Sequence, residues 1–188
     1  PDPTYRSRID AAAESVSLRE AEEVEGDEGM MEVRMPIAST GQVRNEGDDP
    51  LTADELSGMG RQIDTLGKGV FPEHGRSGMD PARYSQFEKL GYWADATLER
   101  EAAADGNDLR VATARMPDPE TLPAATGQYR QRLAVLKEQA KRGIPMSASI
   151  GWREDEDAPG GNDLMEASIV GIGADPRTAT EGGTEALA

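Results

Sequence analysis

The chain has 188 residues, of which 36% are hydrophobic, and its 36 acidic and 20 basic side chains give a formal net charge of −16. That length suits one folded domain with appendages, and so acidic a surface repels phosphate backbones, so we expect no nucleic-acid partner. With no cysteine and one histidine, the chain excludes thiol chemistry and offers poor material for a zinc site, so we expect neither a cofactor nor a metal. Few of the basic residues are lysine, and this acidic composition suits a halophilic protein that stays soluble in high salt.

The first 29 residues are strongly acidic and contain few sizeable apolar side chains. Such a segment buries little surface by itself, so residues 1–29 are predicted to form an acidic N-terminal arm outside the folded domain. Within this arm we expect a helix between Ile9 and Val24.

The folded domain is predicted to begin with a strand over 30–38. Apolar residues alternate with others there at the period of a strand: Met31, Val33, Met35 and Ile37. Pro36 has no backbone donor, so it favours an edge position or a strand end.

A loop rich in Gly, Asn and Asp is expected over 41–50, before the first helix of the domain. Thr52 and Glu55 have the spacing of a capping box, and apolar residues from Leu56 to Leu66 share one helical face. These signals predict a helix over 52–66, interrupted only by two glycines that are unfavourable inside helices.

Two alternating segments, 92–99 and 109–116, flank an Asp-Gly turn signal at 104–107, and this pattern predicts a β-hairpin. After a Pro-rich connection, apolar residues at helical spacing predict an amphipathic helix from Tyr129 to Arg142, with Gly143 as its C-terminal stop.

Two further strands, 146–152 and 164–170, are predicted on either side of an acidic turn. The whole order of elements favours an α+β fold with a mainly antiparallel sheet or barrel. Trp93 and Trp152 are expected to be core or barrel-lid residues rather than residues that stack on a ligand.

His74 is the natural base if the chain performs acid–base chemistry, because histidine is the only residue type that titrates near neutral pH without perturbation. Segments that begin like a calcium loop and a dinucleotide loop each carry a proline at a required position, so both are set aside. A serine with a histidine and a carboxylate remains, because a weak serine nucleophile needs a base and an acceptor that orients the base. Ser147 and Ser149 point to the same face of the predicted strand, so alternation alone does not choose between them.

Three segments resemble the prohead (capsid maturation) proteases of tailed viruses: Gly-Ile-Pro-Met-Ser-Ala-Ser-Ile-Gly-Trp at 143–152, Leu-Met-Glu-Ala-Ser-Ile-Val at 164–170 and Ala-Asp-Pro at 174–176. Those enzymes typically show a Ser-hydrophobic-Gly-aromatic strand, a Glu-x-Ser-hydrophobic-Val strand and a stretch of small residues with proline, all after an upstream histidine. Two features depart from the pattern: Pro-Glu precedes the histidine, and a usual Pro-Ala-Asn ending reads Gly-Ala-Asp-Pro.

The resemblance implies that Ser149 is the nucleophile, that His74 takes its proton and that Glu166 orients His74. Backbone N–H groups would form the oxyanion hole, with Arg177 as a candidate to support that loop. No cofactor or metal takes part in such a site.

The fold that the resemblance implies is assemblin-like: a small, mainly antiparallel β-barrel flanked by helices. The protease-like domain would cover 30–176, and a flexible C-terminal tail would cover 177–188.

The implied function is a serine endopeptidase that cleaves capsid and scaffold proteins during viral procapsid maturation. Its expected substrates are the major capsid protein and the scaffold, its expected location is the host cytoplasm within a procapsid or virion, and homo-oligomerisation stays open. No apolar stretch approaches the roughly 20 residues that span a bilayer and no signal peptide is visible, so no membrane partner is expected. The alternative is a non-catalytic structural protein, associated with the capsid or portal, that has the same fold.

Overall fold

The computed structural model describes residues 6–8, 17–20, 29–41, 49–72, 88–170 and 177. Their elements, with η for a short 3₁₀ helix, are β1 (Arg6–Arg8), β2 (Ser17–Glu20), β3 (Met30–Ser39), α1 (Ala53–Leu66), β4 (Gly69–Pro72), β5 (Gly91–Glu99), β6 (Leu109–Pro117), η2 (Ala124–Thr126), α2 (Gly127–Lys141), β7 (Ser147–Glu154), η3 (Pro159–Gly161) and β8 (Asn162–Val170).

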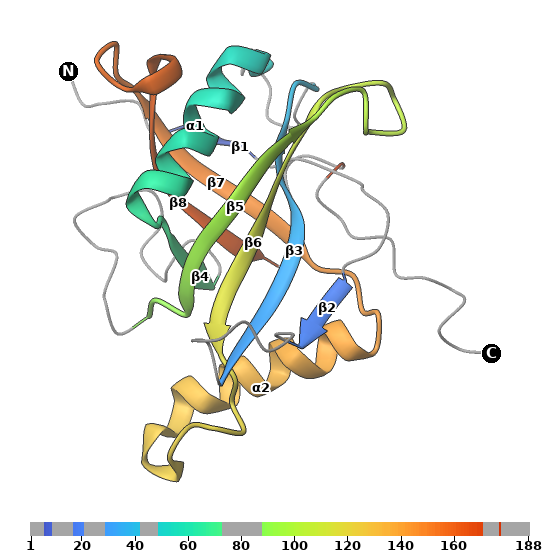
Figure 1. Ribbon diagram of the computed structural model, residues 1–188, viewed down its shortest axis with the longest axis vertical. Helices are drawn as coiled ribbons and strands as arrows, with labels where there is room; N and C mark the ends of the chain where they lie inside the picture. The colour runs from blue at the N-terminus through green and yellow to red at the C-terminus, as the bar shows by residue number, and fades with distance from the viewer. Residues whose placement is uncertain are drawn as a thin grey trace.

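All these strands belong to one curled sheet, in the order β1-β7-β8-β4-β5-β6-β3-β2. Within the described residues every ladder is antiparallel except the one between β4 and β8. The sheet curls so that β3, β5 and β6 cross in front of β7 and β8, while α2 lies below the lower ends of β3 and β6 (Figure 1). The predicted α+β class with a mainly antiparallel sheet is confirmed, and the expected barrel is a half-barrel of one mixed sheet.

The main hydrophobic core joins the long strands to both helices. The four residues whose alternation predicted the first strand of the domain are at most 1% exposed: Met31, Val33, Met35 and Ile37. Trp93 and Trp152 are 0% and 2% exposed, so their predicted core positions are confirmed.

Pro36 lies where its missing backbone donor does no harm. β2 pairs with β3 only from Met31 to Arg34, so one side of Pro36 has no described partner strand. On the other side, the register with β6 shifts between Pro36 and Ala38. A proline is tolerated at such an irregularity because no regular ladder bond is lost.

Helix α1 begins as its sequence predicts. The hydroxyl of Thr52 accepts a hydrogen bond from the backbone N–H of Glu55 at 3.2 Å, and the Glu55 carboxylate accepts one from the backbone N–H of Thr52 at 2.6 Å. Gly58 lets α1 approach η3 closely, because a Cβ at this position would lie 1.9 Å from the carbonyl oxygen of Pro159. The glycine therefore serves packing, at a small cost in helix propensity.

The predicted hairpin and the second helix are also confirmed. β5 pairs with β6 from Tyr92 to Glu99, and Gly106 in the connecting turn has a φ of 80°. Beyond α2, Gly143 has a φ of 63°, the left-handed conformation typical of a helix stop.

Three short strands differ from the expectations. The helix expected between Ile9 and Val24 is wrong over Ser17–Glu20, which forms β2. β1 pairs with β7, so both end strands of the sheet come from residues assigned to the acidic arm. Edge strands are held by backbone hydrogen bonds, so amino-acid composition does not predict them. β4 was not predicted either, since four residues that include a glycine and a proline carry no clear period.

Two expected segments fall largely outside the described residues. They are the loop over 41–50, of which only its two ends are described, and the tail over 177–188, of which only Arg177 is described.

Candidate active site

The candidate site lies on β7 and β8, the strands that carry Ser149 and Glu166. In their antiparallel register, Ser149 pairs with Ser168 and Gly151 pairs with Glu166. Ser149 and Glu166 are therefore diagonal neighbours on adjacent strands, at a Cα separation of about 7–8 Å. The structure thus brings together two of the three residues that the family resemblance implies.

Ser149 and Glu166 project from the face of the sheet that is opposite to the main core. The residues that alternate with them belong to that core: Ala148, Ile150, Ala167 and Ile169. Because successive side chains of a strand point to opposite faces, the polar residues share the other face: Ser147, Ser149, Glu166 and Ser168. The expectation that the two serines of β7 share a face agrees with this alternation.

This polar face is enclosed. Ser149, Glu166 and Ser168 are all 0% exposed, and Ser147 is 5% exposed. A buried carboxylate requires hydrogen-bond donors, because its transfer from water is costly without them. The Ser168 hydroxyl supplies one, donating to the carboxylate of Glu166. In this conformation the site is closed to solvent.

Gly151 makes room for the Glu166 carboxylate. A Cβ at this position would lie 2.7 Å from Oε1 of Glu166, closer than side-chain carbons ordinarily approach an oxygen. The glycine in Ser-Ile-Gly-Trp therefore leaves the space directly opposite Glu166 to its carboxylate.

Two core side chains hold β8 in place. The indole N–H of Trp93 donates to the carbonyl oxygen of Ala167 at 2.7 Å, beside the residues of the site. At the start of β8, the buried amide of Gln62 on α1 donates to the carbonyl of Asn162 and accepts from the N–H of Leu164. These contacts give Glu166 and Ser168 a rigid support, which a catalytic arrangement needs.

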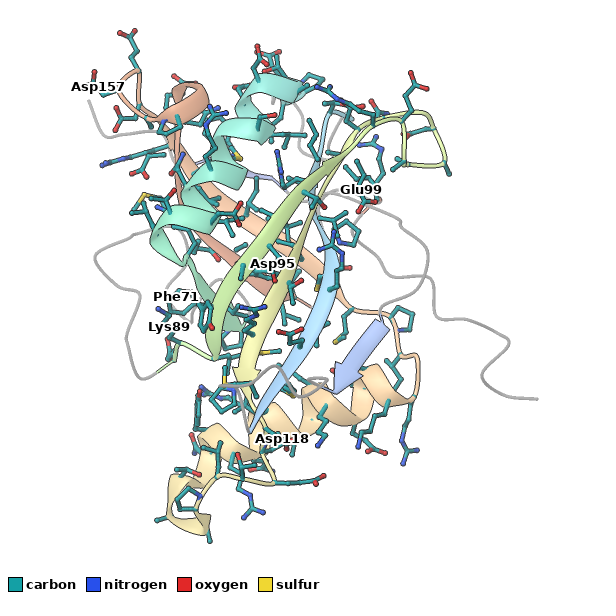
Figure 2. All side chains as sticks on the ribbon, viewed as in Figure 1. Phe71, Lys89, Asp95, Glu99, Asp118 and Asp157 are labelled. Carbon is teal, nitrogen blue, oxygen red and sulfur yellow. The ribbon has the colours of Figure 1, made fainter. Side chains whose placement is uncertain are left out.

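The third predicted residue, His74, lies outside the described residues. β4 runs parallel to β8, with Phe71 opposite Ser168 and Pro72 opposite Ile169. Phe71 is 7% exposed and lies beside Lys89 at this end of the strand (Figure 2). β4 therefore directs the chain along β8 past the level of Ser168, two residues before His74.

A groove of about 490 Å³ lies between α2 and the ends of β4 and β8. Its apolar lining includes Val135 and Leu136 on α2, and its rim includes Arg132. Met146 and Val170 also line it. Met146 precedes Ser147 in the sequence, and Val170 pairs with Ser147 in the β7–β8 ladder. The groove thus reaches Val170, the residue that pairs with Ser147 at the end of the polar face.

Arg177 connects to another part of the sheet. Its Nε donates to the carboxylate of Asp105 at 2.6 Å, in the turn between β5 and β6, and its Nη1 donates to the hydroxyl of Ser39 at 3.1 Å. A role for Arg177 in supporting an oxyanion loop stays a prediction.

Gly151 and Ser168 shape the site, yet neither was predicted to have a role in it. Their signal lies in two motifs taken together. When Ser-Ile-Gly is aligned antiparallel to Glu-Ala-Ser, the glycine falls opposite the glutamate and the two serines fall opposite each other. Neither motif alone predicts that the glycine will lie opposite the glutamate.

Among the described residues, no group of three or more His, Cys, Asp or Glu side chains is placed to hold a metal ion. No helix in that part of the chain is long and apolar enough to cross a membrane. No protein-family model, no curated protein and no solved structure matches the chain.

Proposed function

We propose that the chain is a serine endopeptidase that cleaves capsid and scaffold proteins during maturation of a viral procapsid. Ser149 would be the nucleophile, His74 the base and Glu166 the carboxylate that orients the base. The observation that carries this proposal is the β7–β8 register, in which Ser149 and the buried carboxylate of Glu166 are diagonal neighbours on one face.

In this reaction the Ser149 Oγ attacks the scissile carbonyl carbon while His74 takes the hydroxyl proton and then passes it to the leaving amine. Glu166 would fix the orientation of the imidazole and stabilise its charged form. A carboxylate this deeply buried acts strongly on a nearby cation, because the local dielectric is low.

The chain length after β4 supports His74 as the base. Pro72 pairs with Ile169, which follows Ser168 on β8. His74 is the second residue after Pro72, and two residues of chain span at most about 7 Å. The proposal requires that the His74 imidazole reach the polar face from the end of β4.

The groove between α2 and the strand ends supports a peptide substrate. Its volume and mainly apolar lining are typical of sites that hold an apolar side chain, with polar groups at the rim to fix orientation. A peptide with one apolar side chain in the groove would have its neighbouring residues beside Ser147 and Ser149.

The decisive experiment compares two serines on the same face of the same strand. The purified protein is incubated with an unprocessed capsid protein, and with a fluorophosphonate probe whose adduct is located by mass spectrometry. Ser149→Ala should abolish the adduct and reduce cleavage by several orders of magnitude, whereas Ser147→Ala, the matched control, should retain both. His74→Ala should behave as Ser149→Ala does.

Cleavage that survives Ser149→Ala, or an adduct that moves to Ser147, would contradict the assignment of the nucleophile. A correctly folded protein with neither adduct nor cleavage would contradict the proposal of an endopeptidase.

A second function, a structural capsid- or portal-associated protein, is favoured by the complete burial of Ser149. A packed strand hydroxyl needs no solvent access, whereas a nucleophile does. Copy number per virus particle separates the two functions, because a shell component follows the symmetry of the lattice and a protease does not.

A further inference from the structure

We infer that the outer edge of β7 is a binding surface for an extended peptide, and that the chain's own strand β1 occupies this edge as a substrate-like strand. The inference rests on the proposed function, because it specifies how a peptide reaches Ser149 and what blocks its way. It assigns a regulatory role to the N-terminal segment.

The β7 edge is next to the candidate nucleophile. β8 covers one side of β7 and β1 covers the other, with Arg8 opposite Ile150 and Ser7 opposite Gly151. Neighbouring strands lie about 4.8 Å apart. A peptide bound in the register of β1 and one residue longer would place its backbone opposite Ser149.

β-strand addition explains why such an edge binds peptides of varied sequence. The unpaired N–H and C=O groups of an edge strand bind any extended backbone, while side-chain pockets add selectivity. On β7, a bound peptide would take the backbone hydrogen bonds that β1 makes in this structure. The groove beside Met146 and Val170 would supply the side-chain pocket.

β1 and β2 are the two end strands of the half-barrel, and both come from the same short stretch of chain. β1 pairs at the β7 end of the sheet and β2 pairs at the β3 end. β3 and β7 approach each other across the curl of the sheet. The N-terminal strands therefore meet the sheet at both of its edges, and releasing β1 frees the edge that borders Ser149.

The burial of the site fits this arrangement. Ser149 is 0% exposed while β1 is in place, so a substrate reaches the hydroxyl only after some segment moves. β1 occupies the in-plane position beside β7 on the side opposite to β8, and its three residues form a ladder short enough to exchange with a competing peptide.

Proline substitutions test the inference in the full chain. Consecutive residues of a strand direct their N–H groups to alternate sides, and β1 has a described partner strand on one side only. Because proline has no N–H, one of the two substitutions Ser7→Pro and Arg8→Pro therefore removes a hydrogen bond between β1 and β7. Ser7→Ala and Arg8→Ala are the matched controls. The readouts are backbone hydrogen exchange over β7 and cleavage of a fluorogenic capsid-derived peptide, each repeated with Ser149→Ala to define the background.

We expect one proline variant to accelerate exchange over β7 by about fivefold to tenfold, the equivalent of one lost hydrogen bond, and to raise Ser149-dependent cleavage by a similar factor. The alanine controls should change neither quantity. A synthetic peptide of residues 1–12 should restore inhibition of that variant by raising its KM, whereas a shuffled peptide should not.

Each other outcome has a definite meaning. If neither proline variant changes exchange over β7, β1 does not protect this edge and the inference is wrong. If exchange rises but Ser149-dependent cleavage of the full chain is unchanged, β1 does not block the substrate and the inference is wrong. If exchange rises and the peptide protects the edge again, but no variant shows Ser149-dependent cleavage, the edge binds peptide and the endopeptidase proposal is overturned instead.

Discussion

Gly151 and Glu166 are matched residues on adjacent strands. The carboxylate occupies the space that any larger residue at 151 would fill, with a notional Cβ only 2.7 Å from Oε1. Ser168 then donates to the same carboxylate, so one glycine and one hydroxyl together determine where a buried charge-bearing group lies.

Gly151→Ala should lower the free energy of unfolding by about 1–3 kcal/mol, because the new methyl overpacks against the carboxylate. Urea unfolding of four proteins tests the cause: the wild type, Gly151→Ala, Glu166→Ala and the double variant. The cost of the added methyl should fall sharply in the Glu166→Ala background, where its neighbour is gone. An equal cost in both backgrounds would mean that the carboxylate does not limit the space.

At the residue scale, the sequence predicts which side chains of a strand share a face, but it does not predict which residues of the next strand they contact. Alternation placed Ser147 and Ser149 on one face but did not choose between them, because the choice depends on the neighbouring strand. That strand pairs Ser149 with Ser168 and Ser147 with Val170. Register is a tertiary property, so one strand alone does not contain it.

At the scale of elements, α2 is fastened by a buried ion pair. Lys137 Nζ lies 2.6 Å from the Asp118 carboxylate, and their side chains are 7% and 19% exposed. Burial alone would raise the pKa of Asp118, but hydrogen bonds from Lys137 and from the backbone N–H of Glu120, with the charges of Lys137 and Lys141, hold that pKa below its ordinary value of 3.8. The pair joins α2 to the segment that follows β6, where Asp118 lies close to the helix (Figure 2).

This pair predicts a pH dependence of stability. Because the pKa of Asp118 is lower in the folded protein than in the unfolded chain, its contribution is fully present above about pH 4 and is lost as pH falls through the folded value. Asp118→Asn should therefore be less stable than wild type at pH 7, and the difference should shrink at acid pH. Urea titrations at several pH values measure this.

Glu120→Gln is the matched control for that experiment. Glu120 also lies near Lys137, at 3.2 Å, but its side chain is 76% exposed, so its loss should change stability little. Equal effects of the two substitutions would contradict a special role for the buried partner.

Elements with strong local signals were predicted well. The capping box of α1, the Asp-Gly turn of the hairpin and the glycine stop of α2 each act through neighbouring residues, so the sequence carries them directly. The short strands β1 and β4 depend on partner strands far along the chain for their hydrogen bonds, and β2 depends on its neighbour β3. Their sequences carry little period of their own, which is why the segment before Val24 was expected to be helical.

At the scale of the whole molecule, a net charge of −16 makes self-repulsion a global determinant of stability. The Debye length shortens from about 10 Å at 0.1 M salt to about 3 Å at 1 M, so concentrated salt screens most pairs of surface acids.

We therefore expect the thermal midpoint to rise between 0.1 M and 2 M KCl, by about 2–4 °C for each kcal/mol of repulsion removed in a domain of this size. Differential scanning calorimetry measures the change, with sucrose at matched osmolality as the uncharged control. A higher midpoint in dilute buffer than in molar KCl would overturn the expectation of a halophilic protein.

The ladder between β4 and β8, which is the one parallel ladder among the described strands, also determines the order in which the site can form. Val70 pairs with Ala167, which joins the first half of the chain to a strand that is synthesised after all the other described strands. Pairings between distant residues form late, because the entropy of closing the intervening chain must be overcome first. A growing chain can complete α1 and the β5–β6 hairpin early, but Ser149 has no Glu166 beside it until β8 has emerged and docked. The chemistry proposed for this face is thus absent from a growing chain until β8 has been added to the sheet.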